Sequence, residues 1–98
     1  MQIQMEKIED IATKLNLSRE EILNESLKTF LEKKLREVKS DIYQIQIKWD
    51  VSSVEDFEGK YKKGKIDEKG SWQDLQKLDH LEFKRDEMEQ MLMELKWL

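Results

Sequence analysis

Hydrophobic residues between Arg19 and Trp49 recur at alternating intervals of four and three positions. Such intervals place apolar side chains along one face of an α-helix, at the a and d positions of a coiled coil. The seam consists of Leu31, Leu35, Val38, Ile42, Ile45 and Trp49. Ser18 and Glu21 form a capping box ahead of it, which signals a helix start. The pattern predicts one long amphipathic helix over 19–49.

The two ends of this helix depart from a simple seam. Its first part has a broader apolar face than the seam, so we expect it to touch more than one neighbour. That face consists of Ile22, Leu23, Leu27, Phe30 and Leu31. At the other end, apolar and polar residues alternate from Tyr43 to Trp49, as in a half-buried strand. We favour a helix there because the sevenfold repeat continues unbroken into Trp49, and a short β-ribbon is the alternative.

A second seam with the same spacing lies near the carboxyl end of the chain. It consists of Leu78, Leu81, Arg85, Met88, Leu92 and Leu95, and it spans 18 residues against 19 for the first. Two matched seams joined by the segment 50–71 favour an antiparallel helical hairpin. We expect Arg85 to extend its charged group to solvent or to pair with a carboxylate such as Asp41.

The segment between the seams contains signals for one short helix. Val54, Phe57 and Tyr61 form a helical face of about two turns, which would cap the end of the hairpin. Ser52 with Glu55 predicts the start of this helix, and Ser71 with Asp74 predicts the start of the last helix. Gly64 and Gly70 mark the loop between them.

The first residues can be interpreted in two ways. Ile8, Ile11, Ala12 and Leu15 predict a short helix from about Ile8. Residues 1–6 either extend that helical face backwards or alternate as a strand. We leave both open. The predicted fold is all-α or nearly so: a short amino-terminal strand or helix, then a long antiparallel helical hairpin that resembles a coiled coil.

We expect one cooperative unit with two parts. Residues 1–49 form an amino-terminal helix-turn-helix that runs into the long helix. Residues 50–98 contain the capping helix, the loop and the second hairpin helix. Charged residues make up 41% of the 98 residues and there is no proline, which suits charged helices around a narrow apolar seam.

Charge and composition narrow the possible functions. The net charge is −4, so an overall basic footprint for nucleic acid is missing. The chain lacks cysteine, which excludes disulfides and zinc–thiolate sites and fits a cytoplasmic protein. No signal segment and no apolar run of about 18 residues is present, so we expect no membrane partner.

Candidate chemistry is sparse. His80 is the only histidine, and neither a second ligand at helical spacing nor a nucleophile accompanies it. We interpret it as a surface residue and the carboxylates along Asp79–Glu94 as a solvated helix face. The lysines around Tyr61 form either a phosphate-contacting loop or, as we favour, a solvated loop. We therefore predict a protein that is not an enzyme, with no catalytic residue, no metal and no cofactor.

The carboxyl-terminal residues are more apolar than one hairpin stripe requires. Met91 and Leu98 face one way and Met93 and Trp97 another, outside the seam. Methionine and tryptophan adapt well to partner surfaces, so we predict these four residues to be partner-binding. The alternatives are packing against the chain's own amino-terminal helix and self-association.

Two resemblances to known families add to this interpretation. Met1–Met5, Ile8–Leu15 and Leu17–Leu27 together look like the strand–helix–turn–helix order of ribbon-helix-helix proteins. With Val51–Phe57, Gly64 and the helix from Trp72, the chain also resembles small archaeal and bacterial antitoxins of toxin–antitoxin pairs.

The resemblance to these families implies a homodimer through paired strands. It implies that Gln2 and Gln4 contact bases in the major groove, and that Ser18 and Arg19 bind a phosphate at a helix amino terminus. The segment beyond this motif would wrap and neutralise a small toxin. The resemblance therefore predicts an antitoxin-like protein with weak or absent operator DNA binding.

Two other function classes compete with this prediction. A self-assembling structural protein would use the apolar carboxyl-terminal face only to oligomerise. A DNA-binding regulator without a toxin would bind an operator with steep salt dependence.

Overall fold

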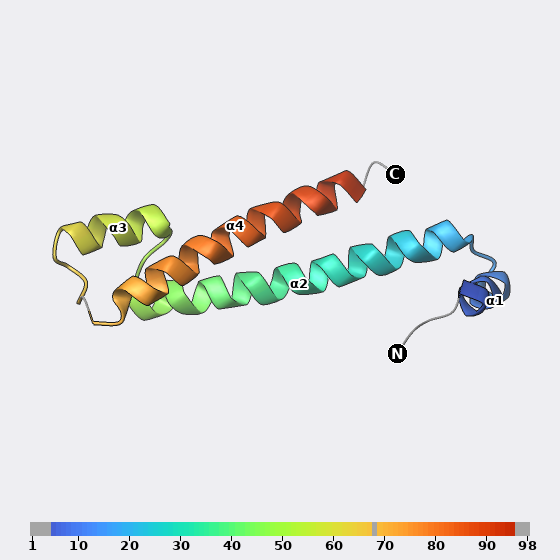
Figure 1. Cartoon of the computed structure of the whole chain (residues 1–98), viewed down its shortest axis with the longest axis horizontal. Coiled ribbons are helices and arrows are strands. Elements are labelled where there is room, and N and C mark those ends of the chain that lie inside the picture. The colour runs from blue at the N-terminus through green and yellow to red at the C-terminus, as the bar shows by residue number, and fades with distance from the viewer. Residues whose placement is uncertain (1–4, 68, 96–98) are drawn as a thin grey trace.

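A computed structural model describes residues 5–67 and 69–95 of the chain. These residues form four helices and no strand: α1 (Met5–Leu15), α2 (Arg19–Trp49), α3 (Val54–Lys62) and α4 (Ser71–Leu95) (Figure 1). The helices α2 and α4 run antiparallel along each other, and the molecule measures 62 × 29 × 16 Å. The structure confirms the predicted all-α fold with a long helical hairpin.

The helix α2 has well-defined ends. The Oγ of Ser18 accepts a hydrogen bond from the backbone N–H of Glu21 at 3.0 Å, as the capping box predicts. At the other end Asp50 adopts a left-handed conformation, with φ 53°, and the N–H of Val51 donates to the carbonyl of Gln46. This backbone arrangement closes a helix with a Schellman motif. Residues 43–49 are helical, so the β-ribbon alternative is wrong.

The helix α1 starts at Met5 and ends in the same way as α2. Asn16 is left-handed, with φ 57°, and the N–H of Leu17 donates to the carbonyl of Ala12 at 2.9 Å. The chain then turns, and α1 crosses the end of α2 rather than lying along it (Figure 1). Met5 and Glu6 are helical, so the strand alternative fails for the described part of residues 1–6. Residues 1–4 lie outside the described residues.

Two predicted helix starts are wrong by one residue. The cap of α3 is Ser53, whose Oγ accepts from the N–H of Asp56 at 3.1 Å, and Ser52 lies one residue earlier. Adjacent serines offer the same side chain, and only the direction of the chain selects between them. Ser71 is the first residue of α4, so it lies inside the helix instead of capping it, and its side chain is fully buried.

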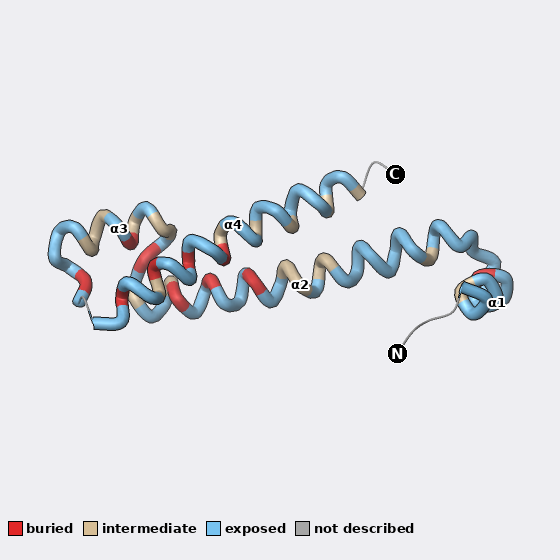
Figure 2. The backbone as a smooth tube through the Cα atoms, in the orientation of Figure 1, coloured by how far each residue is buried: buried red, intermediate tan, exposed pale blue. Residues whose placement is uncertain are grey.

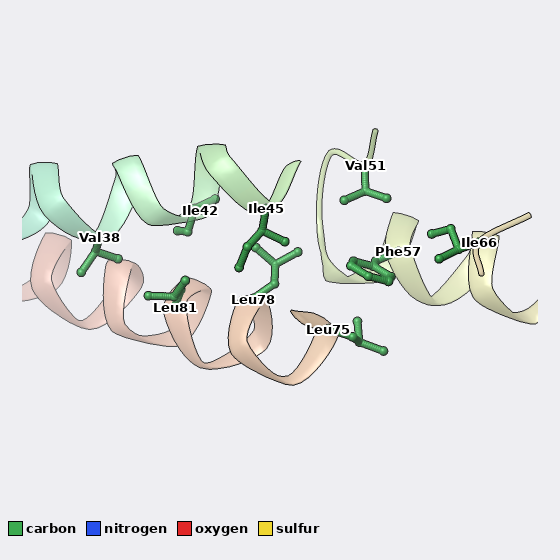
Figure 3. Close-up of a cluster of buried hydrophobic side chains, with 9 residues drawn as sticks. All are labelled: Val38, Ile42, Ile45, Val51, Phe57, Ile66, Leu75, Leu78 and Leu81. Atoms are coloured by element: carbon green, nitrogen blue, oxygen red, sulfur yellow. The ribbon is translucent and has the colours of Figure 1, made fainter. Parts of the chain in front are cut away.

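The hydrophobic core lies where α2, α3 and α4 meet (Figures 2 and 3). Its buried residues are Val38, Ile42, Ile45, Val51, Phe57, Ile66, Leu75, Leu78 and Leu81. Phe57 and Leu78 are completely enclosed, and Trp49 packs on Phe57 with ring centroids 5.6 Å apart. We call this part of the molecule, where α3 joins α2 to α4, the connected end.

Polar contacts also hold the connected end together. The Oδ2 atom of Asp74 accepts hydrogen bonds from the Lys48 ammonium at 2.8 Å and from the Trp49 indole at 2.7 Å. These bonds, with that from Lys48 the stronger cause, lower the pKa of Asp74 below its ordinary value. Glu82 of α4 accepts from the N–H of Val54 at 3.2 Å, so a side chain of α4 caps the first turn of α3.

The acidic side chain of Asp56 belongs to the same region. Its carboxylate accepts from the N–H of Ser52 at 2.9 Å, and this bond is the main reason that the pKa of Asp56 is lowered. Lys60 lies 3.6 Å from the same carboxylate and also donates to the carbonyl of Asp50. Lys60 therefore ties α3 to the end of α2.

Candidate protein-binding surface

Burial decreases along the hairpin away from α3 (Figure 2). We call the opposite part, residues 19–31 of α2 with 88–95 of α4, the open end. There Leu23 is 43% exposed, Leu27 47% and Phe30 55%, although all three are large apolar residues. Water is an unfavourable environment for contiguous apolar side chains, and such patches mark interaction sites. The open end is therefore the candidate binding surface.

A groove lies between the two helices at the open end, where α4 diverges from α2 (Figure 1). It is lined by Leu27, Leu31, Met91, Glu94 and Leu95 and encloses about 420 Å³. Four of its five residues are apolar, and Glu94 is the one charged residue. A groove of this composition can accept the apolar face of a helix from another protein.

The predicted partner-binding residues fall in different places. Met91 lines the groove and is 39% exposed, as a contact residue must be. Met93 is 56% exposed and is not part of the groove lining. The exposure of both methionines shows that α1 does not cover them, so the alternative of internal packing is wrong for these two. Trp97 and Leu98 lie outside the described residues.

The predicted DNA contacts at the start of α2 are engaged within the chain. The Oγ of Ser18 caps the helix, and a guanidinium nitrogen of Arg19 lies 3.7 Å from a carboxylate oxygen of Glu9 in α1. A phosphate at this helix end would have to displace Glu9 from Arg19. Gln2 and Gln4 lie outside the described residues.

Other candidate positions lie on the surface or take part in structural contacts. His80 is exposed. The Nε of Arg85 donates to the neighbouring Asp86 at 3.0 Å, so Arg85 pairs with a carboxylate of its own helix and not with Asp41, the example named for one of the two alternatives. In residues 5–67 and 69–95, no group of three or more metal-ligating side chains gathers. No helix of that part of the chain has the length and hydropathy needed to cross a membrane.

Sequence reasoning placed only one of the groove residues in the binding site. Leu95 and Leu31 were assigned to the two seams, and Leu27 to the broad face at the start of the long helix. The breadth of that face was a usable signal, because an apolar arc wider than one seam requires a second covering surface. Neither seam indicates where the helices separate, since separation depends on the packing of both.

Residues 1–97 match the model of the Uncharacterized protein MJ0235 family. The chain belongs to this family. No match was found among curated proteins or among solved structures. The match extends from the amino terminus through α4, so both ends of the hairpin belong to the region that defines the family.

Proposed function

We propose that this chain is a non-enzymatic protein-binding module, the antitoxin-like partner of a small toxin. The open end holds an apolar helix of that partner, and neutralisation is steric: the bound hairpin covers the toxin's working surface. The observation that supports the proposal is the groove between Leu27, Leu31, Met91 and Leu95, which residues 5–67 and 69–95 leave open.

The chemistry of the groove fits a protein partner. Its walls are leucines and a methionine, and methionine adapts its shape because it is unbranched and flexible. Glu94 lies at the groove and suits a partner helix that carries a basic residue beside its apolar stripe. Small polar ligands would find few hydrogen-bonding groups there.

Protein binding is a better fit to this geometry than operator binding. Ser18 and Arg19 already have partners within the chain, and the net charge is −4. In our proposal DNA contact is weak or absent, and Gln2 and Gln4 make whatever contact there is. In our proposal the protein acts in the cytoplasm, which the lack of cysteine fits.

The experiment is a comparison of three tagged proteins expressed in the native host: wild type, Met91→Asp and Phe83→Asp. Both substitutions place a carboxylate on α4, but Phe83 is 64% exposed and lies outside the groove. We expect wild type and Phe83→Asp to retain one small protein in stoichiometric amount and Met91→Asp to lose it. Co-expression of wild type, and not of Met91→Asp, should then relieve the growth arrest caused by that protein.

Two results would reject the proposal. One is a retained protein whose binding is equally strong with Met91→Asp, because the groove would then not be the contact. The other is recovery of no protein except untagged copies of the chain, which would favour a self-assembling structural protein. Circular dichroism must show equal helix content in all three proteins.

A further inference from the structure

A second regular stripe runs along the exposed side of α2, beside the groove. It consists of Glu20, Leu23, Leu27, Phe30 and Lys34, at intervals of three, four, three and four. These are again the intervals of a coiled-coil seam. At 3.6 residues per turn, the stripe is rotated by roughly 60° from the seam that faces α4. Its three apolar members are about half exposed, so the described part of the chain leaves much of their apolar surface in water.

The order of residues in this stripe is self-complementary. If a second α2 lies antiparallel with a two-fold axis at Leu27, then Leu27 meets its own counterpart. Glu20 then lies opposite the second copy's Lys34. Leu23 and the second copy's Phe30 lie one residue out of register, an axial offset of about 1.5 Å that still allows contact. The central layer and the offset pairs beside it are apolar against apolar, and the outer layers are acidic against basic. A two-fold interface requires that the same surface complement itself, and few helix faces do so.

A parallel pairing of the same stripe fails the charge criterion. It would place Glu20 against Glu20 and Lys34 against Lys34, and like charges in contact oppose association. The Lys34 ammonium lies at the edge of the stripe, 5.7 Å from the centre of the Phe30 ring. It also lies 3.4 Å from a carboxylate oxygen of Glu37 in its own helix, so pairing with the second copy's Glu20 requires Lys34 to share or exchange this exposed partner.

We infer that two copies of this chain form a homodimer through antiparallel contact of their α2 stripes, centred on Leu27. The inference does not rest on the proposed function. The stripe and the groove share only Leu27, so the other four groove residues lie outside the α2 pairing.

A disulfide trap tests the position of the two-fold axis. The chain has no cysteine, so a single introduced cysteine reports only on its own position. Under mild oxidation, we expect Leu27→Cys to give a covalent dimer at low micromolar protein, because the two positions meet at the axis. Lys28→Cys, the next residue and exposed on another face, should stay monomeric on a denaturing gel. Equal cross-linking of both variants, or of neither, would overturn the inference.

Charge exchange tests the direction of the helices. By sedimentation equilibrium, Lys34→Glu should weaken dimerisation by about tenfold, since two acidic pairs replace two ion pairs. The double variant Glu20→Lys with Lys34→Glu should restore the wild-type dissociation constant, because each acidic–basic layer is rebuilt in reverse. A monomeric wild type, or a double variant weaker than Lys34→Glu alone, would contradict the antiparallel dimer.

Two further variants separate this inference from the proposed function. Phe30→Asp should give a monomer that still binds the groove partner, because Phe30 does not line the groove. Met91→Asp should lose the partner and remain a dimer. If Met91→Asp abolished dimerisation and Phe30→Asp did not, the groove and not the stripe would be the contact between copies.

Discussion

The two ends of the hairpin are built from the same two helices, yet they differ in burial. At the connected end Leu78 is fully enclosed, whereas at the open end Leu27 is 47% exposed. The difference lies in what else is present. Two packed helices bury only the stripe between them, and α3 adds a third surface through Phe57. At the open end α1 turns across the helix and supplies no such cover.

The contacts that stabilise the fold and the candidate binding surface lie at opposite ends of the hairpin. The connected end contains the completed core together with the polar contacts of Asp74 and Glu82. The open end keeps apolar surface that a partner or a second copy can cover. A heptad repeat therefore specifies which face of a helix is apolar, but not which molecule covers it.

Matched leucine truncations should give the largest difference between the ends. Leu78→Ala should reduce the free energy of unfolding by about 2–5 kcal/mol, because it leaves a cavity in a closed core. Leu27→Ala should reduce it by less than about 1 kcal/mol, since half of that side chain already contacts water. Urea denaturation followed by circular dichroism, at concentrations low enough for monomer, measures both. Equal losses would mean that the open end is as closely packed as the connected end.

The cap that α4 provides for α3 should give a smaller effect. Glu82→Ala removes the acceptor for the N–H of Val54 and should destabilise the protein by about 1 kcal/mol. Glu82→Gln keeps an acceptor and should lose less. Glu87→Ala, at an exposed position further along α4, is the control and should change stability little. Thermal unfolding compares the three variants, and a control as unstable as Glu82→Ala would mean that the cap contributes nothing.

Acid should weaken the connected end through Asp74 and Asp56. In the folded protein the pKa of each lies below its ordinary value of 3.8. The unfolded chain therefore binds protons at higher pH than the folded chain does. This contribution to stability is complete above pH 3.8 and is lost as the pH falls through the folded-state pKa values.

The variant Asp74→Asn tests this pH dependence. It should flatten the decline of unfolding free energy below about pH 4, measured by urea denaturation across a pH series. Asp79→Asn, an exposed carboxylate on the same helix, serves as the control and should keep the wild-type slope. A slope that Asp74→Asn leaves unchanged would show that the bonds from Lys48 and Trp49 do not lower the pKa of Asp74.

The smallest expected effect concerns the left-handed residues that end α1 and α2. Glycine adopts this conformation without strain, so Asp50→Gly should stabilise the protein by roughly 0.5 kcal/mol. Asn16→Gly makes the same change at the open end, where it should affect the docking of α1 more than global unfolding. Hydrogen exchange of α1 and α2 amides distinguishes the two. If Asp50→Gly and Asn16→Gly change the exchange rates of the most protected amides by the same amount, α1 unfolds together with the core.

The seams made much of the fold predictable. The intervals from Leu31 to Trp49 and from Leu78 to Leu95 predicted both long helices and their antiparallel pairing, and the structure confirms them. The caps were harder, because Ser52 and Ser53 are equivalent in sequence and differ only in backbone conformation. The prediction of one cooperative unit is still to be tested, and a single transition by several probes would support it.

The binding surface was predictable only in part. The excess of apolar residues around Met91 and the broad face at Leu27 were visible in the sequence, but their meeting across the groove was not. Bonds between distant residues, such as Glu82 with the backbone of Val54, leave no local signal at all.

The sequence by itself determined the helical elements, because helix formation depends on intervals of three and four residues and on local caps. Only the tertiary structure decided where those helices are covered. Burial depends on the sum of neighbours at each point, and α3 lies at one end of the hairpin while α1 leaves the other. Apolar residues of the same two helices thus form a closed core at one end and an open groove at the other.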